Sequence, residues 1–313
     1  MGRLDLAMKQ LMKDHTIFAD AFNFRSDHGS HIDPSRLREI DPSVSIVEAL
    51  SGSMHSQSSD LAQRLIVQGD ESRTCALLLL ENQSYIDWLM PFRCLYATAM
   101  RLREETNAIA KRHEKAKDLK DANAFLSGFS PSDRLPHVYI MVLYAGLEPW
   151  NGPLRLADIL VKEDSGCGLY EADCPINLLS LAELSDSEID RFHTNEMKVM
   201  SLAVRLQNDP TRLAELSQTD PAFQDVDSNL YNVVRLTSGF ELPQPTQTKG
   251  NDMKKDISAF KQGLKKEGAI ERDTEIVTNM LKENMSMSII EKATKLSEQQ
   301  IIQIAKANNI PLL

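Results

Sequence analysis

The chain has 313 residues, of which 42% are hydrophobic and 26% charged, and its formal net charge is −10 at pH 7. That length suits one α/β domain with a smaller helical part, and the acidic balance argues against a general polyanion binder. No apolar run approaches the roughly 20 residues that span a bilayer, so we expect no membrane partner, and no signal peptide is predicted. The four cysteines form no CxxC pair, which argues against zinc and for a reduced, cytoplasmic protein.

The first sixty residues give mixed signals. Apolar residues recur at steps of three and four from residue 4 to residue 22, which predicts one amphipathic helix with His15 packed on its core face. The polar, proline-containing stretch 25–42 predicts an irregular connection with one short helical turn. Residues 44–50 fit a short strand or a short helix, and residues 51–59 predict a turn-rich polar segment.

A hairpin is predicted next. Leu61, Leu65 and Val67 precede a turn signal at residues 68–72, and residues 74–80 form a nearly continuous apolar run. Such a run predicts a strand that is buried on both faces. We therefore expect two antiparallel strands joined by this turn.

A helix and two more strands complete the predicted sheet region. Residues 88–117 have helical periodicity, with Pro91 near the start, where proline is tolerated. Residues 137–144 and 175–181 predict further strands. The order helix, strand, strand, helix, strand, strand predicts an α/β fold with a mixed central sheet flanked by helices.

The remainder of the chain predicts helices only. Periodicity indicates helices at 187–207, 209–218 and 224–236, and the two prolines within 242–251 indicate a linker. We expect a sheet-containing domain over residues 1–184, a helical extension over 185–245, and a linker with a C-terminal helical tail over 246–313.

Two capping boxes are predicted in the tail, one formed by Ser288 with Glu291 and the other by Ser297 with Gln300. Two short helices would begin at these serines. Their arrangement resembles a helix-turn-helix in outline, and a plain helical hairpin is the simpler alternative.

A local excess of positive charge interrupts the acidic chain. Residues 101–120 contain seven basic and four acidic side chains. A solvated helix face is the plainer interpretation, and a face that contacts nucleic-acid phosphates is the functional one.

Polar residues follow the most apolar predicted strand. Glu81 and Gln83 would share one strand face, at the strand end where polar groups emerge from the core. An antiparallel hairpin would bring Asp60 beside them. Two carboxylates on neighbouring strands form a hard-oxygen site suited to Mg²⁺ or Mn²⁺, although polar strand ends exposed to water would give the same pattern.

Several segments also carry a resemblance to a known family. They are residues 77–84 (LLLLENQS), 90–93 (MPFR) with Tyr96, 125–129 (FLSGF) with 133–135, 142–146 (VLYAG) with 149–154 (PWNGPL), and the helical stretch 286–305. Their combination resembles the recombination-promoting nuclease / putative transposase family, a bacterial branch of the PD-(D/E)XK nuclease superfamily. In that family Gln stands where most of the superfamily has Lys.

The resemblance implies a PD-(D/E)XK-like core and a metal-dependent DNA endonuclease linked to recombination or mobile elements. Carried over residue by residue, Asp60 and Glu81 would hold Mg²⁺ or Mn²⁺, and Gln83 would replace the usual lysine as the third catalytic residue. A neutral amide cannot supply the positive charge of that lysine, but it can orient water or a phosphate oxygen. Arg93, at the start of the next helix, would contact the phosphate or pair with a carboxylate.

Some assignments have alternatives. Ser59, just before Asp60, stands where the family pattern predicts a basic residue, and Asp20 on the first helix is the alternative carboxylate. Trp150 fits a packing anchor at a turn better than a base-stacking residue. The competing functions are a catalytically inactive nuclease fold that binds DNA or a protein, and a helical partner protein with an α/β scaffold. The sequence leaves open whether the chain forms a homo-oligomer.

Overall fold

The computed structural model describes residues 3–26, 31–47, 54–161, 173–224, 226–238, 240–245, 250–283 and 285–308. The chain divides into two compact units. The first consists of residues 1–240 and 244–253, and the second of residues 241–243 and 254–313. Along the described parts of the chain, no helix is both long enough and apolar enough to cross a bilayer.

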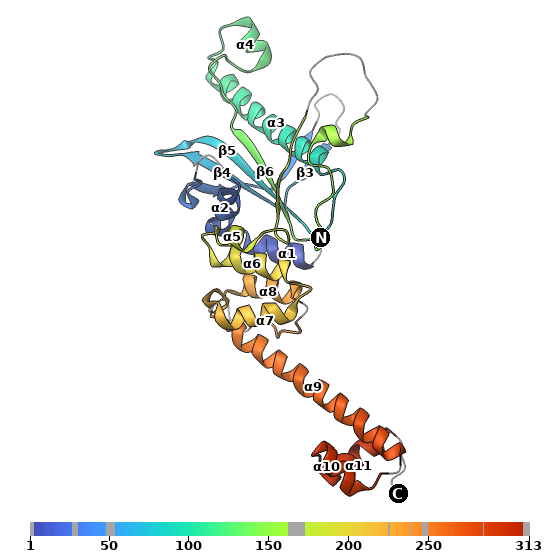
Figure 1. The fold of residues 1–313 in the computed structure, drawn as a ribbon. Helices are drawn as coiled ribbons and strands as arrows, with labels where there is room; N and C mark the ends of the chain where they lie inside the picture. The colour runs from blue at the N-terminus through green and yellow to red at the C-terminus, as the bar shows by residue number, and fades with distance from the viewer. Residues whose placement is uncertain are drawn as a thin grey trace. The chain divides into compact units, whose positions relative to one another are not determined.

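A mixed sheet lies at the centre of the first unit (Figure 1). Within the described residues its strands are, in spatial order, β1 (Leu37–Glu39), β4 (Leu61–Val67), β5 (Asp70–Gln83), β6 (His137–Tyr144) and β7 (Asn177–Ser180). β4 is antiparallel to β1 and to β5, whereas β5, β6 and β7 are parallel to one another. The predicted α/β class with a mixed sheet is therefore confirmed, as is the predicted hairpin of β4 and β5.

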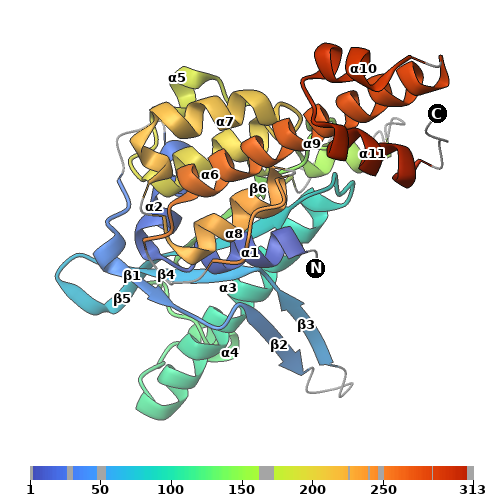
Figure 2. The same ribbon diagram turned by 90° about the horizontal axis from the view of Figure 1, so that it is seen from below.

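The apolar run of β5 is buried because helices cover both faces of the sheet. Figure 2 shows the strands between α3 (Met90–Ala116) and a helical layer that includes α1 (Arg3–Leu11) and α8 (Ser228–Thr237). α3 contacts β6, and α1 contacts β5 and α8. Leu79 packs under α3, with the alternate residues Leu78 and Leu80 on the opposite face, and none of the three is more than 1% exposed.

The N-terminal region folds as two helices, so the prediction of one continuous helix is wrong. α1 ends at Leu11, and α2 (His15–Phe24) begins after Asp14. The Asp14 carboxylate accepts hydrogen bonds from the Thr16 N–H at 2.7 Å and the Ile17 N–H at 3.4 Å. This N-cap starts a new helix within an unbroken apolar pattern, and it leaves His15 half-buried at the helix start rather than in the core.

A second, two-stranded sheet corrects another prediction. The expected helical turn is present as η1 (Pro34–Arg36), and β1 follows it. β2 (Ser43–Val47) pairs antiparallel with β3 (Met54–Ser58), so the described part of the segment predicted as turn-rich is a strand. Residues 48–53, which belong to the same two predictions, lie outside the described residues. Backbone pairing stabilises β3, and its polar composition does not reveal such pairing.

The described residues after Ser185 form helices and one isolated bridge between Val226 and Asn251. In the first unit the helices are α5 (Asp186–Ile189), α6 (Asn195–Arg205), α7 (Pro210–Thr219), the short η3 (Pro221–Phe223) and α8. The single helix predicted over residues 187–207 is wrong, because Thr194 starts a new helix by accepting a hydrogen bond from the Met197 N–H at 3.3 Å. α6 and α8 pack on each other, and α1 packs on α8.

The secondary-structure elements among the described residues of the second unit are all helices. It contains most of α9 (Met253–Lys282), together with α10 (Met287–Thr294) and α11 (Glu298–Ala307). Val277, Ile290 and Ile301, one from each helix, form its buried cluster. The Ser297–Gln300 capping box is confirmed. The Ser288–Glu291 box is wrong, because α10 begins at Met287, with Ser286 at its N-cap.

Candidate functional site

The candidate site lies where β4 begins and β5 ends. Leu61 pairs with Leu80, so Asp60 stands opposite Glu81. The Asp60 N–H donates to the Leu80 carbonyl at 3.1 Å, and the Asn82 N–H donates to Asp60 Oδ2 at 2.8 Å. The Asp60 side chain thus accepts the bond that a backbone carbonyl accepts in a regular ladder, which fixes this carboxylate beside β5.

The predicted site residues share one face of the sheet. Ala62 of β4 and Leu79 of β5 belong to the core cluster under α3. Because side chains alternate along a strand, Asp60 continues the face of Ala62, and Glu81 and Gln83 continue that of Leu79. Asp60, Glu81 and Gln83 are only 8%, 5% and 6% exposed. The structure therefore brings all three together, and it buries them rather than leaving them at a wet strand end.

Arg93 joins this group from the first turn of α3. Its Nη2 lies 3.2 Å from Glu81 Oε2, and its Nη1 lies 2.6 Å from Asp87 Oδ2. Two roles were expected for Arg93, contact with a phosphate or pairing with a carboxylate, and the structure shows it paired with carboxylates. Asp87 was not among the predicted residues, and the signal that could have identified it is an aspartate just before a helix whose second residue is proline.

Burial dominates the electrostatics of the two carboxylates. It raises the pKa of Glu81 to about 7, against the lowering effects of Arg93 and of a hydrogen bond from Ser59, and the neighbouring Asp60 adds to the rise. Burial also raises the pKa of Asp60, against the lowering effect of the Asn82 N–H. The charged form of each carboxylate is therefore only partly compensated by its protein partners.

Helix α1 contributes two charged residues that the sequence did not identify. Asp5 and Lys9 stand one helical turn apart on α1, which contacts β5. Beyond the effect of burial, the Lys9 charge lowers the pKa of both Asp60 and Glu81, and the buried Asp5 raises that of Asp60. The only sequence signal was the spacing of four residues within a helix, and it does not indicate proximity to a distant strand.

Asp20, the alternative carboxylate, has a different role. Its Oδ2 accepts hydrogen bonds from the His193 N–H at 3.0 Å and from the Thr194 N–H and hydroxyl at 2.8 and 2.7 Å. It therefore ties α2 to the start of α6 and is committed to that contact. Trp150 packs edge-on against Tyr144, with ring centroids 5.1 Å apart, as expected for a packing anchor.

The basic stretch 101–120 is divided between fold and surface. Arg101 is buried, donates to the Asp41 carbonyl at 2.6 Å and pairs with Glu104 at 3.1 Å. Its inclusion in a phosphate-contacting face was therefore wrong, because its charge is used inside the protein. The exposed basic side chains are Arg103, Lys111, Arg112, Lys115, Lys117 and Lys120.

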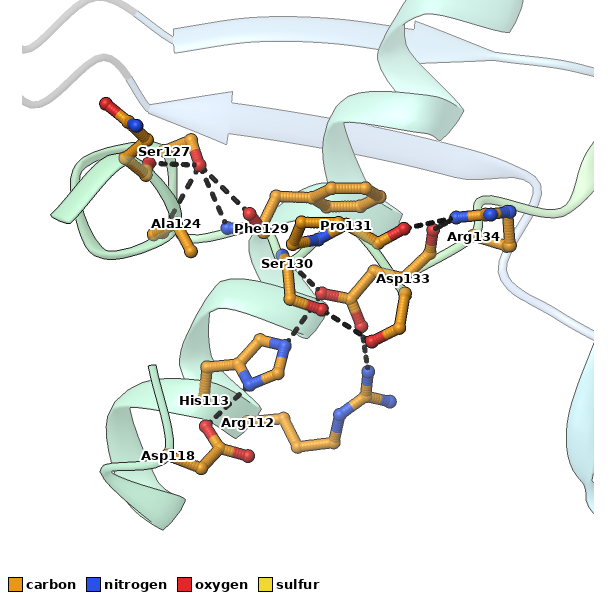
Figure 3. A network of polar contacts seen from close by, with 12 residues as sticks. Arg112, His113, Asp118, Ala124, Ser127, Phe129, Ser130, Pro131, Asp133 and Arg134 are labelled. Atoms are coloured by element: carbon orange, nitrogen blue, oxygen red, sulfur yellow. Dashed lines mark hydrogen bonds and ion pairs between the residues drawn. The ribbon is translucent and has the colours of Figure 1, made fainter. Parts of the chain in front are cut away.

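A polar network fixes the end of α3 to the loop that follows α4 (Ala122–Ser127), as Figure 3 shows. His113 lies between two carboxylates, with Nδ1 2.7 Å from Asp118 and Nε2 2.8 Å from Asp133. Asp133 also accepts a hydrogen bond from the Ser130 N–H at 2.7 Å. Hydrogen bonds to Asp118 and Asp133 raise the pKa of His113, which favours its cationic form.

Beside this network, α3 and α4 border a cavity of about 810 Å³. Lys111 and Lys117 line it together with Phe125 and Leu126, which are 72% and 84% exposed. At the end of α4, Gly128 has φ +65°, and a Cβ there would lie 2.9 Å from Ala110 Cβ on α3. Glycine therefore permits this close approach of the two helices.

Within the ranges that the structure describes, no three His, Cys, Asp or Glu side chains cluster in a way that could hold a metal ion. No family model, no curated protein and no solved structure matches this chain. The assignment of a function therefore depends on the residues and geometry of the chain itself.

Proposed function

We propose that this chain is a divalent-metal-dependent DNA endonuclease of the PD-(D/E)XK type, which hydrolyses phosphodiester bonds in recombination or mobile-element biology. The observation that carries the proposal is the burial of Asp60 and Glu81 opposite each other on neighbouring strands, with Gln83 on the same face. Burying a carboxylate is unfavourable unless a cation or hydrogen bonds compensate it. Two adjacent buried carboxylates are an arrangement that a divalent cation compensates well.

Mg²⁺ or Mn²⁺ fits this donor set, because both ions prefer oxygen ligands and Mg²⁺ keeps several waters. Asp60 and Glu81 would hold the ion. When bound, it would supply Lewis acidity that polarises a phosphoryl oxygen and lowers the pKa of a coordinated water. Burial raises the pKa of Glu81 to about 7, so this carboxyl group would have to give up its proton to become a ligand, and neutral to alkaline pH would favour metal binding.

The other side chains have complementary roles in this proposal. The Gln83 amide can donate to a phosphate oxygen and accept from the attacking water, but it carries no charge. Positive charge comes instead from Lys9 on α1 and Arg93 on α3, both of which lower the pKa of Glu81 against the effect of burial. The exposed lysines near the end of α3 would add sequence-independent contacts to DNA phosphates.

The test is divalent-metal-dependent nicking of supercoiled plasmid DNA by the full chain, with Mg²⁺ or Mn²⁺ against EDTA. Glu81→Ala removes the central carboxylate and should abolish nicking. Glu105→Gln is the matched control, because Glu105 on α3 pairs with Arg64 on β4 at 2.6 Å, away from the proposed site. It should keep full metal-dependent activity.

A second candidate is a catalytically inactive nuclease fold that binds DNA or a protein. The observation that favours it is that both carboxylates already have protein partners, Glu81 in Arg93 and Asp60 in the Asn82 N–H. DNA binding without metal-dependent cleavage would favour this candidate.

The compartment that we propose for either function is the cytoplasm. The described cysteines Cys75, Cys94 and Cys174 are free thiols, as expected in a reducing compartment.

A further inference from the structure

Arg93 occupies a position between two carboxylates that differ in surroundings. Its bond to Asp87 is 2.6 Å long and its bond to Glu81 is 3.2 Å long. The Arg93 side chain is 34% exposed, whereas Asp87 is 18% and Glu81 6% exposed. Among these three side chains Arg93 is therefore the most accessible to a ligand, and the two carboxylates are more enclosed.

Asp87 is itself held in place by the backbone. Its Oδ1 accepts from the Leu89 N–H at 2.9 Å, and its carbonyl accepts from the Met90 N–H at 3.1 Å. These bonds fix the residue at the beginning of α3, while Oδ2 remains directed to Arg93. Asp87 is thus an anchor, since its side chain cannot follow Arg93 without giving up the hydrogen bond from the Leu89 N–H.

Glu81 has competing demands. In the metal-free protein its buried carboxylate has Arg93 as a cationic partner, and in the proposed function the same oxygens ligate a divalent ion. The guanidinium has five N–H donors in a fixed fork, so it can lose one partner and keep another. A phosphate oxygen has the charge and geometry to replace Glu81 as that second partner.

We propose that Asp87 is a positioning residue that holds Arg93 while the guanidinium exchanges its second partner, from the Glu81 carboxylate to a phosphate oxygen of DNA. This inference rests on the proposed function. It adds Asp87 to the site and gives Arg93 two successive roles. In the metal-free protein Arg93 neutralises Glu81, and in the DNA complex it binds the backbone beside the ion.

Two variants that break the same Arg93–Asp87 bond test this with opposite expected signs. In Asp87→Asn, Arg93 keeps its charge but has Glu81 as its remaining carboxylate partner, so it competes with the ion. Mn²⁺ binding, measured by calorimetry on the full chain without DNA, should weaken severalfold. In Arg93→Gln the competing cation is absent, so Mn²⁺ binding should tighten severalfold while plasmid nicking falls at least tenfold.

The matched controls come from a second ion pair between a strand and α3, which joins Arg64 on β4 to Glu105 on α3. Arg64 and Glu105 are 33% and 14% exposed, close to the values for Arg93 and Asp87. Arg64→Gln and Glu105→Gln should leave Mn²⁺ affinity and nicking unchanged. Arg93→Gln should also lower the salt-dependence slope of DNA binding, measured with Ca²⁺, by about one. A structural role alone would not produce opposite shifts in metal affinity.

The outcomes separate the two proposals. If the natural chain binds Mn²⁺ and nicks DNA but both variants shift Mn²⁺ affinity in the same direction, or neither differs from its control, the positioning role is overturned and the endonuclease remains. If the natural chain binds no Mn²⁺, both proposals are overturned. If Asp87→Asn loses its thermal transition, tighter Mn²⁺ binding by folded Arg93→Gln still supports the exchange, and unchanged binding overturns it.

Discussion

Replacing Glu81 by Gln should stabilise the metal-free protein above neutral pH. The pKa of Glu81 is about 7 in the folded chain against 4.5 for an ordinary glutamate, chiefly because of burial. Above pH 7 the folded protein holds a charged group that the unfolded chain accommodates more easily. At about 1.36 kcal/mol per pKa unit, this difference corresponds to a penalty of about 3 kcal/mol. The residue is only 5% exposed, so solvent screening reduces that value little.

The sign of the pH dependence follows from the direction of the shift. Below about pH 4.5 the glutamate is protonated in both states, and it resembles glutamine. Between that pH and about 7 the unfolded chain releases a proton that the folded chain keeps, so stability falls as pH rises. The Glu81→Gln variant has no carboxylate at this position, so its stability does not show this decrease between pH 4.5 and pH 7. Its stability relative to the natural chain should therefore increase by about 3 kcal/mol between pH 4.5 and pH 8.

Urea unfolding at pH 5 and pH 8 in EDTA measures the difference, and Glu105→Gln is the control. Breaking the partly exposed Arg64–Glu105 pair should lower stability by up to about 1 kcal/mol at both pH values. Mg²⁺ at about 100 times its dissociation constant should add about 2.7 kcal/mol to the natural chain and nothing to Glu81→Gln. If Glu81→Gln is destabilised equally at both pH values, the carboxylate of Glu81 carries no burial penalty in the folded protein.

Three further predictions concern the remaining charged groups. Asp20→Ala should lower the free energy of unfolding by about 3 kcal/mol, because it removes the carboxylate that accepts hydrogen bonds from His193 and Thr194. It should leave Mn²⁺ affinity unchanged. If the variant folds but no longer binds Mn²⁺, Asp20 is a ligand of the ion. Because the pKa of His113 is raised, its ion pairs stabilise the fold below the pKa of the unfolded state and are lost as pH rises through the pKa of the folded state. The urea midpoints of the natural chain and of His113→Gln should therefore converge at alkaline pH. A difference between the two midpoints that widens at alkaline pH would contradict this. Replacing Lys111, Lys115 and Lys117 by Gln should reduce the salt slope of DNA binding by about one per lost contact for every sequence tested, whereas an unchanged slope would make this a solvated face.

The sequence predicts the centre of the sheet well because burial leaves a direct compositional record. The leucine run of β5 and the apolar β6 are buried between helices, and Gly69, with φ +79°, marks the turn of the hairpin. Glu81 and Gln83 follow from the same pattern, since a polar residue two positions after a buried leucine keeps its face.

The missed features depend on contacts between distant segments or on caps within periodic stretches. β3 is polar and is stabilised by pairing with β2, and the break after α1 depends on the Asp14 carboxylate. Lys9 approaches the site only because α1 packs on β5. Asp87 and Arg93 are near in sequence, but their shared relation to Glu81 requires the position of α3 on the sheet.

The decisive measurement for a metal-dependent endonuclease is nicking of supercoiled plasmid by the purified full chain in Mg²⁺ or Mn²⁺, compared with Glu81→Ala. We expect relaxed circles that require the metal, disappear in EDTA and are lost in Glu81→Ala, while Glu105→Gln remains active. Absence of metal-dependent nicking by the natural chain, or equal nicking by Glu81→Ala, would contradict it.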